Sequence, residues 1–217
     1  MADKKPFEKR SYNFEMRVLP DEKRAGVRTI TGRPIVYNSR TDLGLFDEII
    51  ESGALDNADL RDVRFLVNHD VSRIPLARSR RNNANSTLRL IPVLEGMDME
   101  TDVDIENNGT ARELVSALDR GDITGMSFMF SIDDFEWEDL ESDHPTRRIK
   151  KIGSVIEISA VTFPAYEDTE IHARAKDALE SARRDLEKAR ESHEADSLES
   201  EKRALELEKL KVEILTK

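Results

Sequence analysis

The stretch GDITGMSFMFSIDD, residues Gly121–Asp134, stands apart from a chain that is otherwise densely charged. Charged residues make up 36% of the 217 residues and hydrophobic residues 38%, yet residues 123–132 carry no charge. An uncharged run of this length in such a chain predicts a buried strand. Ser127 lies in the middle of the run, so it is either an ordinary small polar residue of a buried strand or a nucleophile.

A helix is expected directly before this strand. Thr110 followed by Glu113 forms a capping box, and Gly121 occupies the position at which glycine commonly ends a helix. The sequence FDEIIESGALDN, residues 46–57, predicts a second and shorter helix. The strand that contains Ser127 therefore follows a helix with well-defined ends.

Most of the remaining sequence between residues 12 and 166 has the alternation or the short apolar runs that are typical of β-strands. A hairpin is expected where two of these strands flank Glu95–Gly96. Strands are predicted in residues 12–19, 26–38, 63–69, 86–94, 96–104 and 153–163. The middle of the chain is therefore expected to be mostly strand, interrupted by the two helices.

The two ends of the chain differ from this middle part. Residues 1–11 are polar and are expected to be flexible. Residues 173–217 contain no glycine or proline, and 23 of these 45 residues are charged, which is typical of a solvated helix or a coiled coil. Leu198 and Leu205 are seven residues apart, as in a heptad, although a five-residue step before Leu198 interrupts the register. The segment is either a helical arm that can self-associate or a marginal helix that is largely disordered alone.

Composition excludes several classes of function. A net charge of −11 argues against general nucleic-acid binding, which needs a basic surface. The absence of cysteine excludes disulfides, thiol catalysis and cysteine-ligated zinc. No apolar run approaches the roughly 20 residues that span a bilayer, and no signal peptide is visible at the N-terminus. We expect a soluble intracellular protein with no nucleic-acid and no membrane partner.

Four histidines are present, which limits the search for a general base or a metal site. His144 lies in a polar loop, His172 lies at the start of the charged arm, and His193 lies within it. Their spacing is not that of metal-ligating histidines, so we expect no metal and no other cofactor. His69 differs because it follows the apolar run VRFLV, which places it at the mouth of a buried strand.

Glu157 is unusual because it is the only charged side chain between Ile152 and Tyr166. A buried carboxylate needs a partner, and imidazole is a natural one. A serine nucleophile needs a base, and that base needs an orienting acceptor. Ser127, His69 and Glu157 would supply these three groups, so they form a candidate catalytic triad.

Each of these residues also has an ordinary structural interpretation. A serine in a strand is usually inert. Glu157 can form a structural ion pair with Arg64 or Arg78. His69 can hydrogen-bond to Asp70 or to the backbone. The catalytic interpretation is favoured because a single mechanism explains all three residues at once.

Six motifs occur in an order and at a spacing that resemble those of a known family: GRPIVYNS, FDEIIESGAL, VRFLVNHD, PLARS, GMSFMF and EISAVTFPAY. On these motifs, residues 12–172 resemble the HK97-type prohead (capsid maturation) serine proteases of tailed phages. The resemblance implies an α+β fold of the herpesvirus-assemblin type, in which helices ring a β-barrel. Residues 12–172 would form this protease domain, with residues 173–217 as a C-terminal charged helical arm.

The resemblance also implies a function. Members of the family are serine endopeptidases that cleave scaffold protein, the scaffolding segment of the major capsid protein and commonly themselves, inside the assembling procapsid in the host cytoplasm. The histidine of the NHD-like motif corresponds to His69, the serine of GMSF to Ser127, and the acidic residue of the last motif to Glu157. Met129 departs from the family, because many members have a small residue there. The alternative is a non-catalytic assembly or scaffold factor on a protease-like fold.

Overall fold

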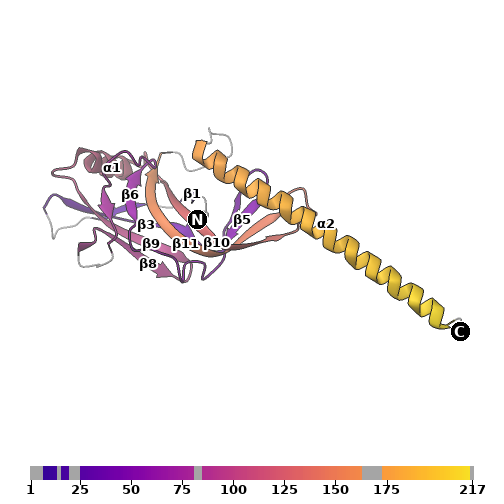
Figure 1. Cartoon of the computed structure of the whole chain (residues 1–217). Helices are drawn as coiled ribbons and strands as arrows, with labels where there is room; N and C mark the ends of the chain where they lie inside the picture. The colour runs from indigo at the N-terminus through magenta and orange to yellow at the C-terminus, as the bar shows by residue number, and fades with distance from the viewer. Residues whose placement is uncertain (1–6, 14–15, 20–24, 81–84, 163–172, 216–217) are drawn as a thin grey trace.

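A computed structural model describes residues 7–13, 16–19, 25–80, 85–162 and 173–215 of the chain. Within these residues the strands form two β-sheets, which two helices accompany (Figure 1). The α+β class expected from the sequence is therefore confirmed. Within the described residues each sheet ends in edge strands, so neither sheet closes into a barrel, and the assemblin-like barrel is not confirmed.

The larger sheet is built on a long antiparallel hairpin of strands β10 and β11. The order β1-β10-β11-β5-β4 leaves β1 at one edge, and β6 and β7 extend the sheet from β11. Strand β5 pairs in parallel with the beginning of β11, and β6 pairs in parallel with its end. The strands of this sheet are β1 (Phe7–Asn13), β4 (Arg40–Asp42), β5 (Asp47–Ile50), β6 (Arg64–Val67), β7 (Ala77–Arg78), β10 (Gly125–Glu138) and β11 (Thr146–Val161).

The smaller sheet has the order β2-β3-β9-β8. Its strands are β2 (Arg17–Leu19), β3 (Val27–Val36), β8 (Leu88–Val93) and β9 (Gly96–Asp104). Strands β8 and β9 form the hairpin that the sequence predicts at Glu95–Gly96. Gly96 has a φ of +150°, and a Cβ there would lie 2.0 Å from the carbonyl oxygen of Ile35. The close approach of β3 therefore requires glycine at this position.

The two sheets pack against each other around a hydrophobic core. Gly32 in β3 allows close packing, because a Cβ there would lie 2.6 Å from the sulfur of Met126 in β10. The buried strand predicted from the uncharged run is confirmed, since residues 125–132 are all buried. Phe128 and Phe130 stack with their ring centroids 4.7 Å apart. The stretch that contains Ser127 is therefore part of the buried centre of the molecule.

Helix α1 spans Gly109–Arg120 and packs its apolar side chains into the core. The capping box expected at Thr110 is wrong, because the N-cap is Asn108, whose side-chain oxygen accepts a 3.2 Å hydrogen bond from the Ala111 N–H. The predicted end is confirmed, since Gly121 has a φ of +75° and caps the C-terminus.

The second helix expected over residues 46–57 is wrong. Asp47–Ile50 form strand β5, which lies between β4 and β11 and is buried at every position. The β-branched residues Ile49 and Ile50 suit this strand, and both neighbouring strands supply backbone hydrogen bonds. A short apolar run does not by itself distinguish a buried strand from a helix.

Strand β1 includes residues 7–11, the last part of the terminus expected to be flexible. Residues 7–13 pair antiparallel with β10, in a register that runs from Phe7 opposite Ser131 to Asn13 opposite Gly125. Residues 1–6 lie outside the described residues. Backbone hydrogen bonds to β10 hold β1 in place. These bonds do not depend on apolar side chains, so the polar composition of residues 7–13 does not predict a strand.

The charged arm is a single helix, α2, which spans Ala173–Leu215. The part of α2 around residues 182–190 packs on the sheets: Ala182 and Leu186 are buried, and Arg190 donates to two carbonyl oxygens of the β10–β11 loop at 3.0 and 2.7 Å. Beyond this point α2 extends away from the sheets (Figure 1), and Leu198, Leu205, Leu207 and Leu210 are exposed. In the described part of the chain, neither helix has the length and apolar character needed to cross a membrane.

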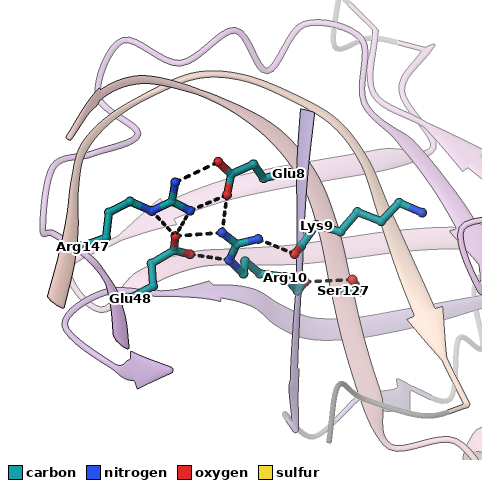
Figure 2. A network of polar contacts seen from close by, with 6 residues as sticks. All are labelled: Glu8, Lys9, Arg10, Glu48, Ser127 and Arg147. Atoms are coloured by element: carbon teal, nitrogen blue, oxygen red, sulfur yellow. Dashed lines mark hydrogen bonds and ion pairs between the residues drawn. The ribbon is translucent and has the colours of Figure 1, made fainter. Parts of the chain in front are cut away.

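A buried charge network fastens β1 to the rest of the larger sheet (Figure 2). It consists of Glu8 and Arg10 from β1, Glu48 from β5 and Arg147 from β11. Arg10 binds both glutamates, and Arg147 does the same, at 2.6 Å from Glu8 and 2.5 Å from Glu48. None of the four residues is more than 8% exposed, so each charge needs an oppositely charged partner.

We predict that this charge network makes the fold sensitive to acid. Burial raises the pKa of Glu48, but ion pairs and hydrogen bonds with Arg10 and Arg147 outweigh burial and leave this pKa below its ordinary value of 4.5. A carboxyl group with a lowered folded-state pKa contributes stability above its unfolded pKa, and this contribution is lost as the pH falls through the folded pKa. The urea midpoint should therefore decrease below pH 4.5. In Glu48→Gln the urea midpoint should decrease less steeply with falling pH than in the wild type. Equal decreases in the wild type and in Glu48→Gln would contradict the prediction.

Candidate active site

The pairing of β10 with β11 places Ser127 and Glu157 on one face of the larger sheet. Ser127 lies opposite Ser159, and Met129 lies opposite Glu157. Residues directly opposite each other in antiparallel strands share a face, and so do residues two apart in one strand. Both predicted residues are buried, with 0% of Ser127 and 1% of Glu157 exposed. The sheet thus presents a serine and a carboxylate side by side, out of contact with water.

Strand β6 brings His69 to the same place. It runs parallel to β11, with Val67 opposite Ala160, and the chain turns immediately afterwards. Asn68 fixes the turn, because its N–H donates to the Ala160 carbonyl at 2.9 Å and its side-chain oxygen accepts from the Thr162 N–H at 2.9 Å. His69 follows this anchored residue, so its backbone is held against the end of β11.

Backbone strain accompanies the turn. Asn68 and His69 have φ angles of +51° and +58°, in the left-handed region. Such a conformation costs a non-glycine residue ~1–3 kcal/mol and is concentrated at functional sites. The strain is a reason to assign His69 a function rather than a packing role.

The imidazole of His69 contacts the buried carboxylate of Glu157. Its Nδ1 lies against Oε1 of Glu157, and Oε2 accepts a 2.6 Å hydrogen bond from the Ser159 hydroxyl. The Ser159 oxygen in turn accepts a 3.1 Å hydrogen bond from the backbone N–H of His69. Each carboxylate oxygen therefore has a partner, and the ring is held by Nδ1, which leaves Nε2 for another group.

The arginines considered as partners of Glu157 bind elsewhere. Arg64 and Arg78 both pair with Asp62, at 3.2 and 2.6 Å. The carboxylate of Asp70 bonds within its own turn and not to the imidazole. The contact between imidazole and carboxylate is thus the arrangement that the catalytic interpretation requires.

Ser127 itself is held by another group. Its hydroxyl donates to the carbonyl oxygen of Arg10 in β1, at 2.8 Å (Figure 2). Within the described residues, no hydrogen bond joins Ser127 to His69. The structure therefore brings the three predicted residues to one face but directs the Ser127 proton to the backbone of β1.

Ser159 belongs to this cluster, although sequence reasoning did not single it out. It is fully buried and bonds to both His69 and Glu157. The alternation of β11 is a signal that could have found it, because Ser159 lies two residues after Glu157 and so shares its face.

His144 belongs to a separate polar group. Its Nε2 lies 3.2 Å from Asp47 and 3.4 Å from Asp42, and these three side chains offer ligand atoms close enough together for a metal ion. Asp47 is also paired with Arg40 of β4 at 2.6 Å, so this buried carboxylate already has a cationic partner. His193 is exposed on α2, and His172 lies outside the described residues.

A hollow of about 560 Å³ opens beside the part of β11 that precedes Glu157. Its lining contains four arginines and two aspartates, so its net charge is positive. A polypeptide with acidic side chains would be attracted to this surface more than a basic one. The lining residues are Asp59, Arg61, Asp62, Arg64, Arg78, Arg80, Ser154, Val155 and Ile156.

The sequence matches the family model described as caudovirus prohead serine protease, over residues 14–184. This range is more than half of the chain and contains His69, Ser127 and Glu157, whereas β1 lies before it. Neither a curated protein nor a solved structure matches the chain.

Proposed function

Because the chain belongs to the caudovirus prohead serine protease family, we propose that it is a serine endopeptidase of phage capsid maturation with Ser127, His69 and Glu157 as its catalytic residues. Its substrates are scaffold protein and the scaffolding segment of the major capsid protein, and it also cleaves itself. It acts inside the assembling procapsid in the host cytoplasm. This chemistry requires no metal or other cofactor.

The proposed reaction starts at the imidazole of His69. Nε2 takes the proton of Ser127 as the hydroxyl oxygen attacks the scissile carbonyl carbon. Glu157, at Nδ1, holds the ring in one orientation and stabilises the imidazolium. The tetrahedral intermediate collapses to an acyl-enzyme as His69 gives the proton to the leaving amine. Water then attacks the acyl-enzyme as His69 takes its proton, and His69 returns this proton to Ser127 as the acid product leaves.

The contact between His69 and Glu157 carries this proposal. A carboxylate that is 1% exposed needs partners that offset the loss of water, and here the partners are an imidazole on a strained turn and a serine hydroxyl. That arrangement orients a base, and a serine lies on the neighbouring strand of the same face. An ion pair with a purely structural role needs neither the strained turn nor the serine.

Covalent labelling by a fluorophosphonate, which reacts with activated serine hydroxyls, tests the proposal. The wild-type protein should be labelled at Ser127, as located by peptide mass spectrometry, and Ser127→Ala and His69→Ala should not be labelled. Ser131→Ala is the matched control, because Ser131 lies on the same strand and bonds to Ser154 of β11. Labelling that persists in Ser127→Ala, or that a chelator removes, would contradict the assignment.

A non-catalytic assembly or scaffold factor on a protease-like fold is the second candidate. The hydrogen bond from Ser127 to the Arg10 carbonyl favours it, because that bond leaves the hydroxyl away from a base. The charged helix α2 also suits binding to capsid or scaffold proteins. The labelling experiment separates the candidates, since an assembly factor would show no serine that reacts in a His69-dependent way.

We predict that the exposed half of α2 pairs with α2 of a second copy. Leu198 and Leu205 are seven residues apart and are 57% and 55% exposed, as on the contact face of a coiled coil. The double variant Leu198→Ser/Leu205→Ser should therefore convert a wild-type dimer to a monomer in analytical ultracentrifugation. Asp196→Ser/Arg203→Ser alters the opposite face of the helix at the same spacing and should leave the dimer intact. A wild-type protein that sediments as a monomer at micromolar concentration would exclude this pairing.

A further inference from the structure

The hydroxyl of Ser127 is occupied by a peptide carbonyl. Ser127 donates to the carbonyl oxygen of Arg10 at 2.8 Å and is fully buried. The strand that supplies this carbonyl, β1, lies at the edge of the sheet and pairs antiparallel with β10 over its whole length. An extended peptide paired to a strand edge, with a carbonyl beside the nucleophile, is also the expected arrangement of a bound polypeptide substrate.

Side chains hold β1 as well as its backbone. Arg10 lies opposite Phe128, so its side chain is on the other face of the sheet from the Ser127 hydroxyl. On that face Arg10 and Glu8 meet the charge socket, which we define as Glu48 and Arg147 (Figure 2). The strand thus offers an acidic and a basic side chain two residues apart, and the socket offers the complementary pair.

Each half of the charge network is neutral by itself. Glu8 and Arg10 contact each other in β1, and Glu48 and Arg147 contact each other in the socket. A buried charge without a partner is strongly destabilising. If β1 leaves, the socket retains its internal ion pair, so no such unpaired charge is left behind. The network therefore permits β1 to be exchanged for another strand with the same charge pattern.

We propose that the edge of β10 is the peptide-binding site of the enzyme and that β1 occupies it as a pseudosubstrate. The charge socket recognises substrates in which an acidic residue is followed two positions later by a basic one, as in Glu8-Lys9-Arg10. Ser127 becomes available to His69 only when β1 leaves β10. This inference rests on the proposed protease function, to which it adds a substrate pattern and a means of control.

Two variants of the full chain distinguish this role from a purely structural one. Glu8→Gln weakens β1 but leaves the charge socket intact, so fluorophosphonate labelling of Ser127 and cleavage of capsid protein should both rise. The rise should be about tenfold or more, as expected for loss of a charge-assisted hydrogen bond. Glu48→Gln weakens β1 and also damages the socket, so labelling should rise while cleavage falls. Asp98→Asn, which breaks an ion pair with Arg33 on the smaller sheet, should change neither.

Peptides added to the Glu8→Gln protein test the substrate pattern directly. The peptide FEKRSYN, which reproduces residues 7–13, should inhibit labelling at a concentration at least ~10-fold lower than FRKESYN, in which the acidic residue and the arginine are exchanged. The two peptides have the same composition and net charge, so a difference reports the order of the charges. If Glu8→Gln melts below the assay temperature, the same comparison on the wild-type protein at millimolar peptide decides, because a tethered strand competes at about millimolar effective concentration.

The outcomes separate this inference from the proposed function. Equal or slower labelling of a folded Glu8→Gln protein overturns the inference and leaves the protease assignment intact. Equal inhibition by the two peptides, or no inhibition by either, does the same. Absence of Ser127 labelling from the wild-type protein and from every variant overturns the proposed function itself.

Discussion

Ser127→Ala is expected to lower cleavage of the capsid protein by at least ~10³-fold. Without the hydroxyl no acyl-enzyme forms, and the residual rate reflects binding and hydrogen bonding alone. The fold should survive, because the change removes only the hydroxyl and its hydrogen bond to the main-chain carbonyl of Arg10, and it adds no bulk to the core. The measurement is the fraction of major capsid protein cleaved over time in procapsids that carry the variant, followed by gel electrophoresis and mass spectrometry.

The same variant also tests self-cleavage. The intact mass of the wild-type chain should fall during maturation, whereas Ser127→Ala should keep its full mass, including helix α2. Ser131→Ala should behave as the wild type in both measurements, since the Ser131 hydroxyl bonds to Ser154 of β11 and has no part in the proposed reaction. A Ser127→Ala protein that processes capsid protein at the wild-type rate would end the serine protease assignment, and an arm left intact in active particles would end only the self-cleavage part.

Local patterns draw attention to the candidate site residues, although each pattern alone also fits a structural role. Ser127 lies in an uncharged run within a charged chain, and Glu157 is the lone charge in an apolar segment. His69 follows a short apolar run, at the point where a buried strand reaches the surface. These signals are readable because burial leaves its mark on the composition of each segment. The pairing of β10 with β11 then turns two such segments into neighbours.

The partners of these residues are not readable in the same way, because they come from distant parts of the chain. The carbonyl that binds the Ser127 hydroxyl lies 117 residues away in sequence. Glu8 and Arg10 look like surface residues of a polar terminus, yet they are buried because β5 and β11 supply opposite charges 38 to 139 residues away. The local sequence around a buried charge whose partner is so distant looks the same as the local sequence around an exposed charge. For this reason the polar composition of residues 7–13 does not predict that they form a strand.

Glu157→Gln is expected to lower kcat by ~10³- to 10⁴-fold, because it forces the wrong tautomer on His69. The Ser159 oxygen accepts from the backbone N–H of His69, and its own hydrogen is directed to Oε2 of Glu157. In the glutamine variant, the amide oxygen fits beside this hydrogen, which leaves the amide NH₂ facing Nδ1. Nδ1 must then accept, so the ring proton moves to Nε2. Protonated in this way, Nε2 has no lone pair with which to take the proton of Ser127.

This account predicts that Ser159→Ala has opposite effects in two backgrounds. Alone, it removes a hydrogen bond to the carboxylate of Glu157 and should lower kcat. In Glu157→Gln, it lets the amide turn its oxygen toward Nδ1, so the double variant should be faster than Glu157→Gln. Ser159→Thr keeps the hydroxyl and should give no such rescue, and the ¹⁵N shifts of His69 should report the tautomer in each protein. A double variant slower than both single variants would contradict this account. The hydrogen bond from Ser159 would then have no influence on which ring nitrogen of His69 carries the proton, and Glu157 would act through its charge alone.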